Sequence, residues 1–298
     1  MYKKIVLWLS QLLTTRNRSI NMPKYDQEYM TLGLVMESKD ELDTEIINST
    51  ITMILGLNLN NIVFKDKKTW EDYFKKVLNL TKNLLKANEH YRKYYKEEEI
   101  FLREYKKKCL KNSNTNVFLT TDPVSLNTEI DGFLSQIKSA LDTLATTMNP
   151  LLGFNLNGWH KNKDKDGIKK SGTRIVNSIE NLPEFLKNKA KGLKKHIENN
   201  VDGITYIVNL RDKVHHSGGL KSITDITYDF RNKEVISQYI IHSEGKELVK
   251  NFLLRTLKDI VLFFNDTLIL SILIKTPSGM CIRKNNKKDF PPYNWFAY

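Results

Sequence analysis

Cysteine is scarce in this chain of 298 residues, which contains only Cys109 and Cys281. Their separation and the placing of the six histidines suggest neither a zinc site nor a disulfide framework. A reducing compartment suits such a chain, so we expect a cytoplasmic protein. We also expect no bound metal and no cofactor.

Long hydrophobic runs are lacking too. The first 13 residues resemble a signal peptide, but their apolar part, Ile5 to Leu9, is too short and no small-residue cleavage site follows. The most apolar stretch, residues 260–274, carries Asn265 and Asp266 and is shorter than the roughly 20 residues of a membrane span. We therefore expect no membrane partner and interpret residues 260–274 as a buried helix.

Several enzyme signatures are missing as well. The chain has no phosphate-binding glycine loop of the Walker type, no zinc-ligand cluster, and no serine-hydrolase or kinase motif. Residues 160–170 combine Lys and Asp, but they lack the alternating acids and the closing Glu of a calcium loop. These absences argue against nucleotide-dependent and metal-dependent chemistry.

Positive charge, in contrast, is in excess. The chain has 47 Lys and Arg residues against 34 Asp and Glu residues, a net charge of +13. Such a balance indicates a polyanionic partner, above all nucleic acid, although a lysine-rich surface can serve solubility alone. The basic segments 161–170 and 187–195 either line an RNA groove or form ordinary surface. Trp159 and Tyr228 either stack on bases or pack in the core.

The spacing of apolar residues predicts a mainly α chain with an N-terminal helical region over residues 1–120. Ser38-Lys39-Asp40-Glu41 has the form of a capping box. Helices are expected over residues 1–14, 38–57, 67–88 and 89–111. Residues 112–116 are rich in Asn and Ser, and we place a domain boundary near residue 120.

A second domain is expected over residues 121–278, followed by an extended tail over 279–298. Asp122-Pro123 predicts a helix start, and apolar residues then recur at helical spacing to Met148. Alternation over 223–230 and 235–241 predicts a late β-hairpin with Asn232 in its turn. The other expected elements are a loop over 153–166, helices over 167–181, 183–198 and 201–216, and a last helix over 245–275 capped by Ser243.

One short motif, residues 211–216, contains the candidate catalytic residues. Arg211 and Asp212 are followed by Lys213, Val214, His215 and His216, and Ser217-Gly218-Gly219 then stop the predicted helix. Arginine binds phosphate bidentately and keeps its charge, whereas histidine exchanges protons near neutral pH. This combination can cut RNA without a metal. The alternative is an arginine paired with an acid on a neighbouring helix, and solvated histidines at a helix C-terminus.

These residues resemble the motif of the HEPN superfamily, which is Arg, a polar residue, three further residues and His. The match is Arg211, Asp212, residues 213–215 and His216, and the resemblance covers residues 121–275. It implies a HEPN-like helical bundle and a metal-independent endoribonuclease of phage-defence or toxin systems. In members paired with a nucleotidyltransferase antitoxin, a Tyr lies two residues after the His. Gly218 stands at that position in this chain, so we do not expect the protein to be silenced by modification of a tyrosine there.

The two histidines compete for the catalytic role. On an unbroken helix His215 shares a face with Arg211, whereas His216 points away. The family pattern selects His216, which requires the helix to loosen at the following glycines. We therefore expect His216 to act as general acid or base, with His215 as its assistant or a bystander.

Further residues are candidates to bind the substrate. They are Lys213, and Lys138 and Asp142 on one face of the long helix, which alternatively form an ordinary solvated stripe. One Arg-His pair offers a single imidazole where an acid and a base are both wanted. The resemblance therefore implies a homodimer, with the helices near 126–148 and 245–275 as candidate interfaces. The expected partners are RNA, a second copy of the chain, and an antitoxin or a sensor partner.

Overall fold

The fold of this protein is described from a computed structural model. The structure describes residues 3–6, 35–38, 42–43, 46, 63–64, 66–111, 119–163, 167, 169–216, 223–242, 245–277, 280–284 and 293–297. It is mainly helical, as predicted, with short antiparallel strands before, between and after the long helices. Among the described helices, none is long and apolar enough to cross a membrane.

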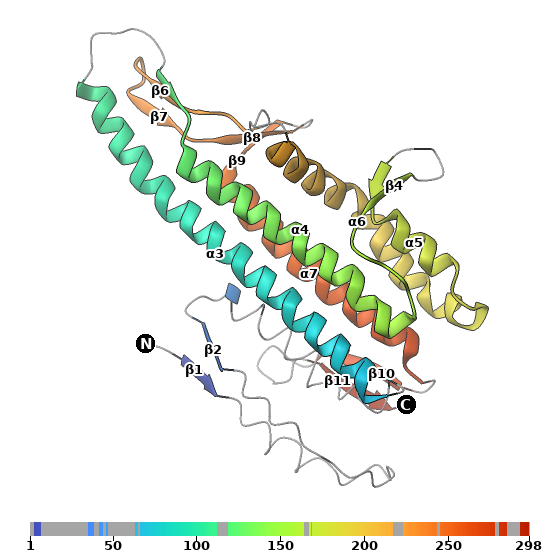
Figure 1. The fold of residues 1–298 in the computed structure, drawn as a ribbon. Coiled ribbons are helices and arrows are strands. Elements are labelled where there is room, and N and C mark those ends of the chain that lie inside the picture. Colours follow the sequence, from blue (N-terminus) through green and yellow to red (C-terminus); the bar gives the residue numbers. More distant parts are fainter. Residues whose placement is uncertain are drawn as a thin grey trace.

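Four long helices form the body of the molecule. They are α3 (Lys67–Lys111), α4 (Val124–Leu152), α6 (Glu184–His216) and α7 (Val249–Lys275). In Figure 1, α4 and α7 lie in the middle, with α3 on one side and α6 on the other, and α4 and α7 each contact both flanking helices. A short helix, α5 (Thr173–Glu180), packs on α6.

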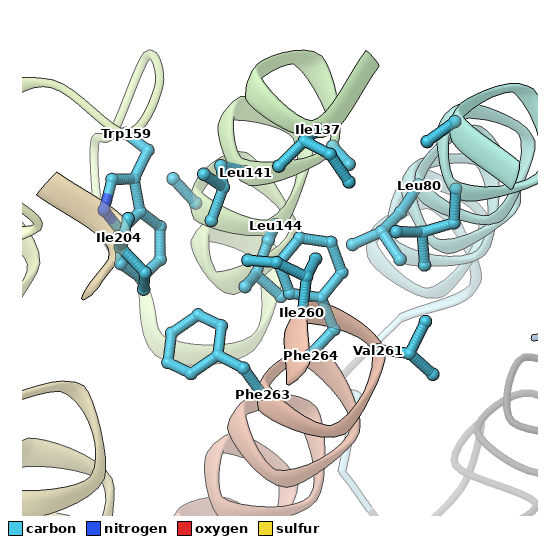
Figure 2. Close-up of a cluster of buried hydrophobic side chains, with 14 of the residues drawn as sticks. Leu80, Ile137, Leu141, Leu144, Trp159, Ile204, Ile260, Val261, Phe263 and Phe264 are labelled. Atoms are coloured by element: carbon cyan, nitrogen blue, oxygen red, sulfur yellow. The ribbon is translucent and has the colours of Figure 1, made fainter. Parts of the chain in front are cut away.

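The core lies where α4 meets α7. The apolar residues of α4 recur at helical spacing and are buried, and α7 is buried in the same way. Figure 2 shows Leu144 of α4 and Phe264 of α7 at the centre, with Leu80 reaching in from α3. The candidate dimer interfaces of α4 and α7 therefore have most of their apolar side chains buried within the chain.

Two helices are longer than the sequence patterns suggested. The patterns over 67–88 and 89–111 belong to the single helix α3, and those over 183–198 and 201–216 belong to α6. The predicted breaks were wrong because no proline interrupts either segment and the buried face continues across each junction. In α6, Ile197, Val201 and Ile204 remain buried through the expected break.

The predicted β-hairpin is present as β6 (Ile226–Asp229) and β7 (Glu234–Ile236). Asn232 lies in its turn, as predicted, and donates its side-chain amide to Asp229, 2.7 Å away. Lys233, the last residue of the turn, has a positive φ, of 55°. A strand that the sequence analysis missed, β3 (Leu119–Thr121), pairs with β6 and makes a three-stranded sheet.

Other short strands correct further expectations. The last helix begins at Val249 and not near 245, because β8 (Tyr239–His242) and β9 (Gly245–Leu248) form a second hairpin before it. Leu248, not Ser243, is its N-cap residue, and Ser243 lies outside the described residues. The tail is extended where the structure describes it, and its two strands, β10 (Met280–Lys284) and β11 (Tyr293–Ala297), pair with each other.

The N-terminal region departs from expectation in the same way. Residues expected in a first helix instead form β1 (Lys3–Val6), which pairs with β2 (Val35–Ser38). Ser38 therefore ends a strand and does not cap a helix, although residues 42, 43 and 46 are helical. The remainder of the helix expected to residue 57 lies outside the described residues.

The expected domain boundary near residue 120 falls between two helices that share one core. Helix α3 runs antiparallel to α4, so that His90 contacts Glu129 and Asn83 contacts Thr143. The approach is close at Gly132, where an added Cβ would meet the His90 ring at 2.4 Å. The buried residues of α3 belong to the same hydrophobic cluster as those of α4.

Candidate functional site

Helix α6 carries the Arg-His motif at its C-terminal end. Its backbone is helical from Glu184 through His216, because apolar residues such as Ile204 and Val208 are buried along its length. At about 100° per residue, position 215 lies about 40° from position 211 around the helix, and position 216 about 140°. Any loosening of the helix therefore lies beyond residue 216, outside the described residues.

The guanidinium of Arg211 is partly exposed. Its side chain keeps 28% of its accessible surface, and Nη1 lies 3.4 Å from Oδ1 of Asp212. Its Nε is buried and has no hydrogen-bond partner among the described residues. The long contact to Asp212 leaves the exposed edge of the guanidinium able to bind an anion.

Asp212 is also held from outside the helix. Lys161, on β4 (Lys161–Lys163), donates from Nζ to Oδ2 of Asp212 at 2.5 Å. Strand β4 pairs with β5 (Lys169–Ser171), which packs against α6. The backbone N–H of Ser171 donates to the Thr205 hydroxyl at 2.9 Å. The β4–β5 hairpin thus brings a second cation to the Arg211–Asp212 pair.

The pKa of Asp212 lies below its usual value. Partial burial raises this pKa, but the hydrogen bond and charge of Lys161, followed by those of Arg211, outweigh that effect. Asp212 is therefore a carboxylate at neutral pH. Its charge offsets part of the positive charge of its two partners.

This lowered pKa predicts a pH-dependent contribution to stability. The contribution is present above the unfolded pKa of about 3.9 and is lost as pH falls through the lower folded value. We expect Asp212→Asn to lower the free energy of unfolding at pH 7 and to have no effect at pH values below the folded pKa. Urea denaturation across this pH range measures it. The control, Asp202→Asn on the same helix, removes a carboxylate that is 83% exposed and should change stability little at either pH.

Asp142 and Lys138 on α4 act on the loop that leads to Lys161. Lys138 Nζ lies 2.6 Å from Oδ1 of Asp142, and the backbone N–H of Trp159 donates to the same oxygen at 2.7 Å. Gly158 packs on this carboxylate, since an added Cβ would lie 2.8 Å from it. The two predicted substrate-binding residues are thus brought together with each other. They reach the Arg211 site through residues 159–161 rather than by direct contact.

The aromatic candidates for base stacking lie in the core. Trp159 has no exposed surface and Tyr228 only 1%. Trp159 packs edge-on against Phe263 with ring centroids 5.5 Å apart, and Tyr228 packs edge-on against Phe230 at 4.8 Å. Both rings are therefore packed in the core, which is the second of the two alternatives that the sequence left open, and neither is accessible to stack on a base.

Lys213 is exposed, but it follows Arg211 by two residues and therefore lies about 160° from it around α6, so the helix does not bring this predicted substrate-binding residue together with Arg211. The backbone of His215 and His216 is helical, whereas their side chains are not among the parts that the structure describes. Lys161 was not singled out from the sequence as a residue of this site. The available signal in the sequence was its place in the basic segment 161–170. Its contact with Asp212 depends on the path of the loop after α4, which that signal does not predict.

The described residues include no group of three or more His, Cys, Asp or Glu side chains placed to hold a metal ion. The end of α6 thus combines a partly exposed arginine and an aspartate between two cations with two histidines in the last turn of the helix. Comparisons with protein-family models, with curated proteins and with solved structures find no match for this chain.

Proposed function

We propose that this protein is a metal-independent endoribonuclease of a phage-defence or toxin system, with its site at the end of α6. The observation that supports this most is the set of cations at that site. The Arg211 guanidinium is partly exposed, and Lys161 contacts the carboxylate of Asp212 next to it. A phosphodiester is the anion that such a group binds well. The resemblance of residues 211–216 to the HEPN motif adds the histidines.

The proposed reaction is a transesterification. The 2′-oxygen of the RNA attacks the adjacent phosphorus, and the bond from phosphorus to the 5′-oxygen breaks. A base removes the 2′-hydroxyl proton and an acid protonates the leaving 5′-oxygen, which gives a cyclic phosphate and a 5′-hydroxyl. His216 is the proposed proton-transfer group, and such transfer contributes about 10²- to 10⁴-fold. Arg211 stabilises the charge that develops on the phosphate oxygens.

Asp212 orients this machinery in the proposal. Its carboxylate contacts both Arg211 and Lys161, so it fixes the two cations relative to each other. An incoming phosphate competes with Asp212 for the guanidinium, whose contact to the carboxylate is 3.4 Å. The weaker of the two contacts is therefore the one that substrate binding replaces.

We further propose that the active form is a homodimer in which two α6 ends face each other. A second copy supplies the second imidazole, so one can act as acid while the other acts as base. The apolar residues of α4 and α7 are mostly buried within the chain. The dimer contact is accordingly assigned to the surface around the motif, and not to those helices.

The alternative is a non-catalytic HEPN-like helical module that binds nucleic acid or a partner protein. The observation that favours it is the engagement of both Arg211 and Lys161 with Asp212, since a paired arginine can be purely structural. The two proposals differ in whether bound RNA is cut.

The defining test is cleavage of a labelled RNA by the purified full chain in EDTA. We expect the rate with EDTA to equal that without it, and the products to end in a 2′,3′-cyclic phosphate and a 5′-hydroxyl. A matched RNA with 2′-O-methyl groups throughout should bind and stay intact, because it lacks the nucleophile. Binding of both RNAs without cleavage would support the non-catalytic module. Cleavage that EDTA abolishes would contradict the proposal.

A further inference from the structure

The last three turns of α3 project past the beginning of α4. The two helices are antiparallel, and His90 on α3 lies 2.7 Å from Glu129, close to the start of α4 at Val124. Helix α3 continues to Lys111, well beyond this point. At 1.5 Å per residue, residues 101–111 add about 16 Å of helix. Figure 1 shows this end of α3 beside the β6–β7 hairpin and beyond the body of the bundle.

This projecting end is strongly basic. Residues 101–111 contain five cations and one acid, whereas residues 67–100 contain nine Lys and Arg residues and six acids. The five cations, which we call the α3 terminal surface, are all exposed: Arg103, Lys106, Lys107, Lys108 and Lys111. Glu104 pairs with Lys107 at 3.1 Å and lies 3.9 Å from Arg103. The other three have no ion-pair partner among the described residues.

Helix stability explains only part of this charge. Cations stabilise the last turn of a helix through the macrodipole, which accounts for Lys108 and Lys111. Arg103, Lys106 and Lys107 lie further from the end, where this effect has faded. Mutual repulsion of five cations on three turns opposes helix formation. A polyanionic partner removes that repulsion.

The surface suits a nucleic acid better than a membrane. A helix that binds at a membrane surface presents a continuous apolar face between its charged residues. Over residues 101–111 the large apolar side chains apart from Leu110 are at most half-exposed, and Leu110 has 48% of its surface exposed. Phe101 and Tyr105 stack on each other with centroids 6.1 Å apart. A cluster of exposed cations without an exposed apolar face matches a phosphate backbone.

We propose that the α3 terminal surface binds the phosphate backbone of single-stranded RNA, apart from the Arg211 site. The β6–β7 hairpin lies beside this end of α3 in Figure 1, and its turn carries two more exposed cations, Arg231 and Lys233. The idea that this surface holds RNA for cleavage at the Arg211 site rests on the proposed function. The idea that it binds RNA does not, because binding there requires no cleavage.

The test measures binding of the full chain to a fluorescent 30-nucleotide RNA carrying 2′-O-methyl groups, by anisotropy at several salt concentrations. The variant is Lys106→Gln/Lys107→Gln/Lys108→Gln, which removes three charges and keeps good helix-forming residues. We expect the affinity at 0.15 M salt to fall about 10- to 50-fold and the slope of log K against log salt to fall by about 2.

The matched control is Lys68→Gln/Lys75→Gln/Lys82→Gln, which removes three exposed charges from the other end of the same helix. It should change the affinity less than twofold. Equal losses in both variants, or none in the first, would overturn the proposal. So would weaker binding of the first variant to phosphatidylserine vesicles with unchanged RNA affinity. Because this RNA cannot be cleaved, failure of the nuclease proposal leaves the result interpretable.

Discussion

Alanine in place of either Arg211 or His216 should slow RNA cleavage by about 100-fold or more. Arg211 carries a side chain that is 28% exposed, and its guanidinium lies 3.4 Å from the carboxylate of Asp212. Its loss leaves the developing negative charge on the phosphate without its strongest donor. Arg211→Lys should recover little of the lost cleavage activity, because the point charge of a lysine does not replace the planar pair of donors of a guanidinium. Single-turnover cleavage with enzyme in excess measures this effect without the contribution of product release.

The control for this loss is Arg255→Ala. Arg255 is also a partly exposed arginine paired with a carboxylate, Oε2 of Glu247 at 2.6 Å, but it lies on α7. The Arg255→Ala variant should cleave RNA at nearly the wild-type rate. If it loses as much activity as Arg211→Ala, the effect reflects net charge and not a site. Retention of full activity by Arg211→Ala would remove the nuclease proposal altogether.

The same assay separates the two histidines. With α6 helical through residue 216, position 215 follows Arg211 by about one turn, and position 216 lies on another side of the helix. A loss confined to His215→Ala would place the site on one helix face within one chain. A loss confined to His216→Ala would support a site completed by a second copy, because position 216 then faces away from its own Arg211.

The sequence was most informative where local patterns coincide with burial. The apolar spacing up to Met148 predicted α4, which runs from Val124 to Leu152, because that helix is packed against three others along its length. Alternation likewise predicted β6 and β7. Strand β3 was missed because its three residues, Leu119–Thr121, become a strand only by pairing with β6, more than 100 residues away.

The candidate site shows the same division. Arg211, Asp212 and Lys213 could be found from the sequence because their spacing is local. Lys161 could not, because its contact with Asp212 depends on how the loop after α4 returns to α6. That return is fixed by Asn149, whose side chain bonds the backbone of Leu156 in both directions, and by the burial of Trp159. Neither interaction leaves a signal in a single sequence.

Trp159 is the anchor of this loop. Its indole has no exposed surface and packs against Phe263 of α7 at 5.5 Å. Figure 2 shows it beside Leu141 and Ile204, which come from α4 and α6. Gly172 lies directly on the ring, since an added Cβ would meet it at 3.0 Å. One side chain therefore joins three helices and both ends of the β4–β5 hairpin.

Trp159→Ala should lower the free energy of unfolding by about 3–5 kcal/mol, because it leaves a cavity that rigid helices cannot fill. Trp70→Ala is the matched control. Trp70 stacks on Phe74 but is only half-buried, so its loss should cost clearly less. Urea denaturation of both variants measures the difference. In the folded fraction, Trp159→Ala should also weaken RNA cleavage, because Lys161 follows Trp159 by two residues and holds Asp212. Equal destabilisation by the two variants would contradict the anchoring role. Unchanged cleavage by folded Trp159→Ala would show that Lys161 reaches Asp212 without this anchor.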